Sequence, residues 1–160
     1  MDDDRPHVDI FTDGGAIGNP GPGGYGVILR CGDLVREISG GYRLTTNNRM
    51  EIMAAIVGLE ALKRPSRVTI HTDSQYLANA MTENWARKWR ARGWKRAGGQ
   101  PALNPDLWER LLQLADQHEV RFRWIRGHAG HPENERADRL AVQAAMQPNL
   151  PRDEGYEGDV

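Results

Sequence analysis

Four acidic residues occupy short polar motifs that interrupt an otherwise apolar pattern. These motifs are Phe11-Thr12-Asp13-Gly14-Gly15, Asn47-Asn48-Arg49-Met50-Glu51, His71-Thr72-Asp73-Ser74-Gln75 and Glu133-Asn134-Glu135-Arg136-Ala137-Asp138. Four carboxylates in one pocket repel each other, and protons or bound cations relieve that repulsion. Carboxylate oxygens suit Mg²⁺ or Mn²⁺ better than zinc. If folding brings Asp13, Glu51, Asp73 and Asp138 together, the sequence predicts a divalent-metal site.

Each acid taken alone has a simpler structural interpretation. An aspartate that ends a strand before two glycines, as Asp13 does, is usually a turn residue. An aspartate that precedes a serine and a glutamine, as Asp73 does, is usually a helix cap. A structural role is therefore favoured for any one acid, whereas the four motifs together favour a shared site.

The composition is that of an ordinary globular protein. The chain has 160 residues, of which 39% are hydrophobic and 27% are charged. We expect one domain over residues 1–146 that buries its own core. Residues 147–160 are rich in proline, glycine and acid, which predicts a disordered acidic tail.

Cysteine content and hydropathy indicate a compartment. The single cysteine, Cys31, excludes an internal disulfide and fits a reducing environment. The acidic N-terminal segment does not resemble a secretory signal. No stretch approaches the roughly 20 apolar residues of a membrane-spanning helix. We therefore expect a cytoplasmic protein with no membrane partner, and a monomer because no oligomerisation signal is present.

The formal net charge of −1 conceals a basic segment. Residues 85–105 contain no acid and six bases, namely Arg87, Lys88, Arg90, Arg92, Lys95 and Arg96. Tryptophans alternate with these bases, and aromatic faces among cations fit a nucleic-acid backbone. The pattern predicts that this basic segment, over about residues 85–100, binds nucleic acid. Because Trp85 and Trp89 are four residues apart, we expect one to pack inward and the other to be exposed.

Three strands are expected in the first third of the chain. Apolar patterns predict strands over residues 8–13, 25–31 and 34–44, with Gly32 and Asp33 as a two-residue hairpin loop. The glycine- and proline-rich segment 18–24 is expected to be a turn-rich connection without regular structure. Strands joined so closely should be antiparallel neighbours.

The hydrophobic period then changes to helical spacing. Helices are expected over about residues 47–61 and 75–81, within 86–96, and from Pro105 and Pro132 onwards, with strands at 68–70 and 120–124. Crossovers that extend a hairpin-built sheet predict an α/β fold. Its mixed five-stranded sheet would have three antiparallel strands followed by parallel additions, and helices would flank it.

The motifs and their order resemble bacterial ribonuclease HI, of the type 1 ribonuclease H family. The resemblance runs from about residue 8 to 146 and includes Thr12-Asp13-Gly14, Gly18-Asn19-Pro20-Gly21-Pro22-Gly23-Gly24, Thr46-Asn47-Asn48-Arg49-Met50-Glu51, Thr72-Asp73-Ser74-Gln75 and Gly127-His128-Ala129-Gly130-His131-Pro132-Glu133-Asn134-Glu135-Arg136-Ala137-Asp138. One motif alone is weak, but the set is specific. The resemblance implies a ribonuclease H-like fold. It also implies an endoribonuclease that hydrolyses the RNA strand of RNA–DNA hybrids and leaves 5′-phosphate and 3′-hydroxyl ends.

The resemblance also implies roles for single residues. Asp13, Glu51, Asp73 and Asp138 would be catalytic ligands of two Mg²⁺ ions when substrate is bound, with Mn²⁺ as an alternative. His128 would be a mobile histidine that assists proton transfer or product departure. Amide side chains beside the acids can read 2′-hydroxyl groups, and bases can hold phosphates. We therefore expect substrate contacts from Asn19, Thr46, Asn47, Asn48, Gln75, Arg87, Lys88, Trp89, Arg90 and Arg92, of which Thr46 resembles part of a DNA-phosphate pocket. The basic segment over about residues 85–100 resembles the basic protrusion of the family.

The sequence departs from the family pattern at one place, and it leaves two alternative functions open. Gly15-Ala16-Ile17 stand where many relatives carry a serine and a cysteine, and this change leaves every expected ligand in place. The alternatives are a hybrid-binding module without catalysis and a DNA nuclease of the same fold. Arg121, Arg123 and Arg126 extend the positive surface without a specific role, and His71, His118 and His131 are expected to be structural.

Overall fold

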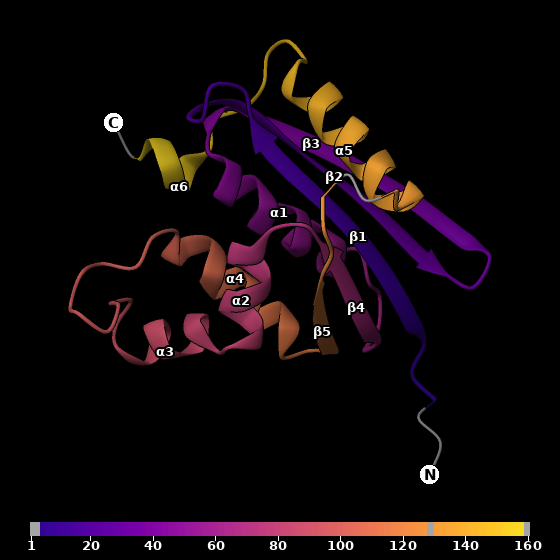
Figure 1. Cartoon of the computed structure of the whole chain (residues 1–160), viewed down its shortest axis with the longest axis horizontal. Coiled ribbons are helices and arrows are strands. Elements are labelled where there is room, and N and C mark those ends of the chain that lie inside the picture. Colours follow the sequence, from indigo (N-terminus) through magenta and orange to yellow (C-terminus); the bar gives the residue numbers. More distant parts are fainter. Residues whose placement is uncertain (1–3, 128–129, 159–160) are drawn as a thin grey trace.

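A mixed five-stranded sheet forms the centre of the molecule (Figure 1). The computed structural model describes residues 4–127 and 130–158. The strands occur in the spatial order β3-β2-β1-β4-β5. Their bounds are β1 His7–Ala16, β2 Gly21–Cys31, β3 Leu34–Thr45, β4 Arg67–Thr72 and β5 Glu119–Trp124. The first three strands are antiparallel neighbours, and β4 and β5 are added in parallel to β1, which confirms the predicted fold class.

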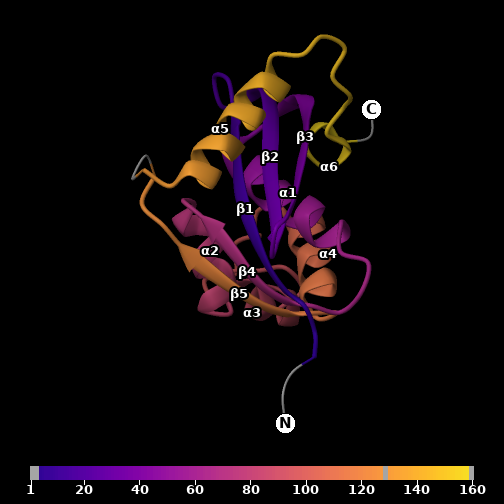
Figure 2. The same cartoon turned by 90° about the vertical axis from the view of Figure 1, so that its right-hand side faces the viewer.

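Helices cover both faces of the sheet (Figures 1 and 2). Their bounds are α1 Asn47–Glu60, α2 Gln75–Thr82, α3 Trp85–Ala91, α4 Pro105–Ala115, α5 Pro132–Ala145 and α6 Glu154–Glu157. On one face, α1 packs on β1 and β2, α4 packs on α1, and α2 packs on β4 and β5. On the other face, α5 packs on β1, β2 and β3. No helix of the described part of the chain is long and apolar enough to cross a membrane.

The main core lies between the sheet and the α1 face. Fully buried residues from several elements fill it, among them Ile10, Ile56, Ile70, Leu77, Trp108 and Leu111. Alternate residues of β1 and β4 point into this core, while their neighbours point to the α5 face. Acids near the ends of β1 and β4 therefore lie at the margin of a rigid, packed scaffold.

The segment 18–24 differs from the expectation of a connection without regular structure. Strand β2 already begins at Gly21, and its first residues pair with β1 and β3. Gly24, and Gly26 further along the strand, are needed because α5 packs very close to them. A Cβ at Gly24 would lie 2.2 Å from the carbonyl oxygen of Ala141, and one at Gly26 would lie 2.1 Å from that of Ala137. Composition alone does not separate such a packing surface from a turn.

Residues 147–158 also differ from the expected disorder. They follow a defined path that includes α6, and Asp153 in this segment is 3% exposed. Its carboxylate accepts hydrogen bonds from Arg49 Nε at 2.7 Å and Nη2 at 2.9 Å, and from Thr45 Oγ1 at 2.7 Å. The buried guanidinium of Arg49 on α1 therefore anchors the C-terminal segment. Composition does not reveal this pairing.

Candidate metal and catalytic site

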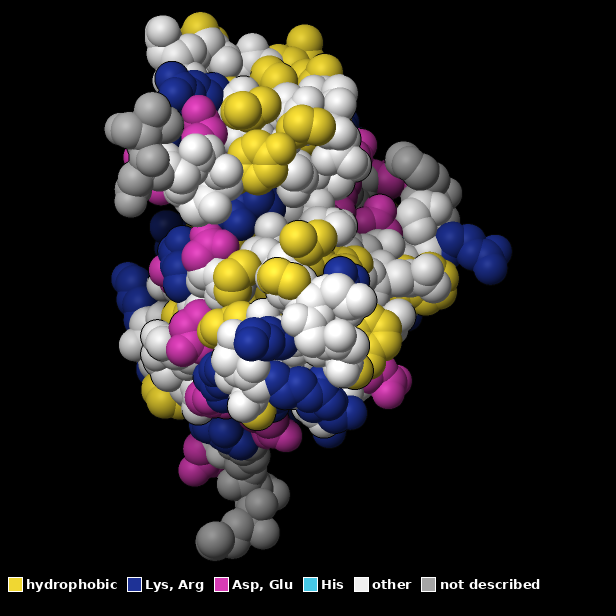
Figure 3. Space-filling view, turned by 90° about the vertical axis from the view of Figure 1, so that its left-hand side faces the viewer, with side chains coloured by type: hydrophobic (Ala, Val, Ile, Leu, Met, Phe, Trp, Pro, Cys, Tyr) yellow, Lys and Arg dark blue, Asp and Glu magenta, His cyan; other side chains and the backbone are white. Residues whose placement is uncertain are grey.

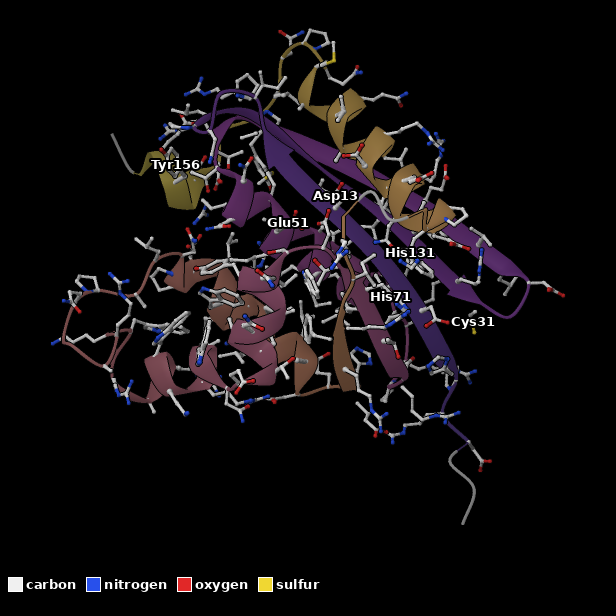
Figure 4. All side chains as sticks on the ribbon, viewed as in Figure 1. Asp13, Cys31, Glu51, His71, His131 and Tyr156 are labelled. Carbon is white, nitrogen blue, oxygen red and sulfur yellow. The ribbon has the colours of Figure 1, made fainter. Side chains whose placement is uncertain are left out.

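Three of the four predicted acids converge where β1, α1 and β4 meet. Asp13 lies on β1, Glu51 in the first half of α1, and Asp73 directly after β4. One carboxylate oxygen from each residue lies within 4.8 Å of the others. Figure 4 shows Asp13 and Glu51 close together beneath α5. The arrangement is that of a carboxylate cluster able to hold a cation.

Local structure explains why these side chains meet. Strands β1 and β4 are parallel neighbours, so their carboxyl ends lie at the same edge of the sheet. The Thr46 hydroxyl accepts a hydrogen bond from the Arg49 amide at 3.2 Å and caps the start of α1. The Trp124 indole donates to the Asp73 carbonyl oxygen at 3.1 Å and holds the end of β4.

The fourth acid, Asp138, reaches the cluster from α5. It lines one pocket together with Asp13 and Asp73. Asp138 is also among the groups that raise the pKa of Asp13. Asp138 follows Ala137, which is fully buried against the sheet. The structure thus brings together all four acids that the sequence singled out.

Burial and mutual repulsion dominate the electrostatics of this cluster. Burial, followed by the charge of Asp73 and the contact with Asp138, raises the pKa of Asp13 to about 8. Burial, followed by the charges of Asp13 and Asp73, raises the pKa of Glu51 well above its usual range. Glu51 Oε2 is buried and has no hydrogen-bond partner among the described residues. An unsatisfied buried oxygen beside other carboxylates fits a divalent cation, which would satisfy it.

Three polar residues expected to contact substrate form one loop network beside the acids. Asn47 Oδ1 accepts a hydrogen bond from the Ala16 amide at 2.7 Å. The backbone N–H of Asn47 donates a hydrogen bond to Asn19 Oδ1 at 3.0 Å. The Thr46 hydroxyl forms the helix cap described above. These bonds fix the start of α1 against the β1–β2 connection.

Two further candidates are exposed to solvent. Asn48 lies in the first turn of α1, and Gln75 is the first residue of α2. Each is therefore near an acid in the chain, Glu51 and Asp73 respectively. The structure places both at helix N-termini, where backbone amides also face solvent.

The basic segment forms α3 and the loop that follows it. Figure 3 views the molecule from the left-hand side of Figure 1, where α3 lies, and shows Lys and Arg side chains gathered on its lower half. Arg87 bonds to Asp116 at 2.7 Å and Arg90 to Glu109 at 3.3 Å, whereas Lys88 and Arg92 are exposed. These last two bases therefore have their charges most available to a ligand.

The two tryptophans of α3 are unequally placed. Trp89 is half-buried, with its ring centroid 6.0 Å from that of Trp108 in the core. Trp85 is 39% exposed. The residue chosen for substrate contact, Trp89, thus packs inward, and the exposed aromatic surface belongs to Trp85. Helical spacing predicted one of each kind but did not identify which.

Several pocket residues were not singled out as site residues by the sequence. Asn134, Glu135 and His131 line the pocket of the acids. Glu135 precedes Asp138 by three residues on α5, a spacing that puts both on one helix face and could have indicated it. His128 lies outside the described residues.

Comparisons with known proteins agree with this geometry. The family model described as RNase H matches residues 5–146. A ribonuclease H of Rippkaea orientalis is 60% identical over 157 residues, which cover 98% of this chain and 96% of the relative.

Solved structures give the same result. LC9-RNase H1, a type 1 RNase H with the type 2 active-site motif, has a TM-score of 0.79 and 36% identity, covering 91% of this chain and 74% of that one. LC11-RNase H1 was solved in complex with an RNA/DNA hybrid. It has a TM-score of 0.64 and 27% identity, and the match covers 86% of this chain and 96% of that one. The motifs, the fold and these relatives together show that the chain belongs to the ribonuclease H family, an enzyme family that depends on divalent metal ions.

Proposed function

We propose that the protein is a metal-dependent endoribonuclease that hydrolyses the RNA strand of RNA–DNA hybrids. Its products would carry 5′-phosphate and 3′-hydroxyl ends. The observation that carries this proposal is the cluster of Asp13, Glu51 and Asp73, whose oxygens lie within 4.8 Å of one another and include a buried, unpartnered oxygen of Glu51. The hybrid bound by LC11-RNase H1 supports the choice of substrate.

Asp13, Glu51, Asp73 and Asp138 would hold the cations. When bound, two Mg²⁺ ions activate a water molecule, neutralise the phosphate and stabilise the departing oxygen. Asp13 is grouped with Glu51 and Asp73 and lines one pocket with Asp138, so it would be the central ligand of the set. Because its pKa is raised to about 8 without metal, cation binding near neutral pH would release a proton from the site.

Selectivity for a hybrid requires one set of contacts to the RNA strand and a separate set of contacts to the DNA strand. Asn19, Asn47, Asn48 and Gln75 would contact the 2′-hydroxyl groups of RNA. Thr46 and the bases of α3, including Arg87, Lys88, Arg90 and Arg92, would hold the DNA strand through its phosphates. In this arrangement, the exposed ring of Trp85 takes the aromatic role that the sequence gave to Trp89.

Three features remain predictions from the sequence. His128, next to the pocket in the chain, would assist proton transfer or product departure. Mg²⁺ is proposed as the cellular ion because the ligands are all oxygens. A cytoplasmic location and a monomeric state follow from the single cysteine and from the absence of an oligomerisation signal in the sequence.

The alternatives fit the site less well. A module that only binds hybrids would gain nothing from four acids collected beside a polyanion, because they would repel it. A DNA nuclease of the same fold would keep the metal ligands but would not need amide side chains that read 2′-hydroxyl groups.

One substrate panel tests the proposal. End-labelled RNA–DNA hybrid, single-stranded RNA, duplex RNA and duplex DNA would each be incubated with Mg²⁺, with Mn²⁺ and with chelator. We expect cleavage of the RNA in the hybrid alone, and none with chelator. Cleavage of duplex DNA would favour the DNA nuclease, and hybrid binding without cleavage in either metal would favour the binding module.

A further inference from the structure

Within residues 4–127 and 130–158, half of one sheet face carries no helix. On this face α5 packs on β1, β2 and β3, while β4 and β5 are covered by α2 only on the opposite face (Figure 2). Val120 and Phe122 of β5 pack toward the α2 side. Alternation along the strand therefore turns Arg121 and Arg123 to the uncovered side, where both are exposed. We refer to the outward residues of β1, β4 and β5 on this side as the open face.

The strand register arranges the open face in three rows. The first row is His7, Arg67 and Glu119, the second is Asp9, Thr69 and Arg121, and the third is Phe11, His71 and Arg123. Asp13 is the next outward residue of β1, so the acid cluster is the row that follows. With a rise of about 3.3 Å per residue, successive rows are about 7 Å apart. The open face therefore continues directly from the metal site.

The charges on this face are only partly neutralised. Arg5 pairs with Glu119 and Arg30 with Glu133. Asp9 bonds to His71 at 2.9 Å. Arg123 contacts the other ring nitrogen of His71 at 3.3 Å, which does not offset its charge. Among the described residues, neither Arg121 nor Arg123 has a carboxylate within ion-pair distance, so both suit an anionic ligand.

The open face also contains a hollow and a pair of stacked rings. A hollow of about 340 Å³ is lined by His7, Arg67, Thr69 and Arg121, among others. In the third row, the rings of Phe11 and His71 are stacked with centroids 4.5 Å apart, and the Arg30 guanidinium lies 5.8 Å from the Phe11 ring centre. Cations interleaved with aromatic rings are the usual features of a surface that binds single-stranded nucleic acid.

The position of the basic protrusion indicates which nucleic acid reaches this face. A hybrid duplex that contacted both the acid cluster and α3 would extend from the cluster toward the side of the sheet that α2 covers, because α3 packs on α2 and α4. Arg121 and Arg123 are on the reverse side. The duplex would therefore leave the open face uncovered, whereas a single strand could turn onto it from the acids.

We propose that the open face binds an unpaired extension of the RNA strand that continues from the hybrid past the metal site. Arg123 would contact the phosphate nearest the cluster and Arg121 the next one along. This proposal rests on the proposed function, because the acid cluster must hold the RNA strand. The proposal gives a role to Arg121 and Arg123, two bases that the cleavage reaction itself does not require.

The test compares a double variant with wild type on four hybrids. The variant is Arg121→Ala with Arg123→Ala, and the substrates are a blunt hybrid and hybrids with a 5′ RNA extension, a 3′ RNA extension or a DNA extension. We expect a raised KM, with unchanged kcat, for one of the two RNA extensions only. Two single-strand phosphate contacts would lower the slope of log KM against log salt for that substrate by about 1.4. Arginine-to-lysine changes at both positions should largely restore the wild-type KM.

The matched control is Lys63→Ala with Arg64→Ala, which removes the same charge from exposed residues after α1. It should leave the KM for all four hybrids unchanged. An unchanged KM for both RNA extensions in the Arg121 and Arg123 variant would overturn the proposal, and so would an equal rise for the blunt hybrid. Failure of the proposed function would look different, because wild type would then not cleave the blunt hybrid at all.

Discussion

Gly14 on β1 lies directly against the backbone of Met50 on α1. A Cβ at Gly14 would lie 2.4 Å from the carbonyl carbon of Met50 and 2.7 Å from the amide nitrogen of Glu51. Non-bonded carbons prefer about 3.5–4.0 Å, so no side chain fits there. The close approach of strand and helix at this point sets the spacing between Asp13 and Glu51.

Gly14→Ala should therefore push α1 away from β1. Overpacking of this kind costs about 1–3 kcal/mol of unfolding free energy. It should also weaken Mg²⁺ binding, because Glu51 would move away from the cluster. Denaturant unfolding and calorimetric titration with Mg²⁺ measure the two effects separately.

Gly15→Ala is the matched control for this change. The nearest atom to a Cβ at Gly15 is Asn47 Oδ1 at 3.5 Å, an ordinary contact. We expect near-normal stability and Mg²⁺ affinity in this variant. Wild-type Mg²⁺ affinity in Gly14→Ala would show that the contact with Met50 does not set the ligand spacing.

The raised pKa of Asp13 predicts how stability depends on pH without metal. Burial and the neighbouring acids raise this pKa from 3.8 to about 8. A carboxyl group whose pKa is raised by folding stabilises the fold fully below its unfolded pKa, and this contribution is lost as pH rises through the folded value. In chelator, wild type should therefore lose unfolding free energy between about pH 4 and pH 8.

Asp13→Asn removes this ionisable group. Its unfolding free energy in chelator should fall less over the same pH range, and Mg²⁺ should stabilise it much less than it stabilises wild type at pH 8. We also expect no RNA cleavage, with hybrid binding largely retained. Near-normal turnover by Asp13→Asn would refute its role as a metal ligand.

Asp153 should contribute strongly to stability although it lies beyond the family match. Its partner Arg49 is 2% exposed and also binds Asp106 through two hydrogen bonds of 3.0 and 2.7 Å. Removing one partner of a buried ion pair costs about 3–5 kcal/mol. Asp153→Ala should show this loss in urea unfolding. Glu157→Ala, which breaks only the exposed pair with Arg43, should change stability little.

The bases of α3 should not contribute equally to hybrid binding. Lys88 on α3 and Arg92 directly after it are exposed, whereas Arg87 and Arg90 are paired with acids. Lys88→Ala with Arg92→Ala should raise KM and lower the salt slope by up to about 0.9 for each phosphate that the variant no longer neutralises. Arg87→Ala with Arg90→Ala is the comparison and should have the smaller effect. Equal effects would show that the ion pairs open when hybrid binds.

The sheet was predictable because its signals are local. Alternating apolar residues marked β1, β3 and β5, and Gly32 with Asp33 formed the expected hairpin, with Cys31 paired to Leu34. The start of β2 was missed because Gly21 to Gly24 have the composition of a turn. The small size of Gly24 instead serves the packing of α5, a partner more than a hundred residues away, and Gly21 and Gly23 lie directly against Ile17 and Thr45.

The motifs by themselves singled out the four candidate acids, since each stands in a recognisable setting beside a strand end or on a patterned helix. Only the tertiary structure decided how near the acids lie and which of their oxygens is left without a partner. It also decided that Trp85 rather than Trp89 is exposed and that Arg49 anchors Asp153. The reason is physical: residue type and spacing are properties of neighbours in the chain, whereas burial, pKa and ion pairing depend on atoms brought together from distant segments.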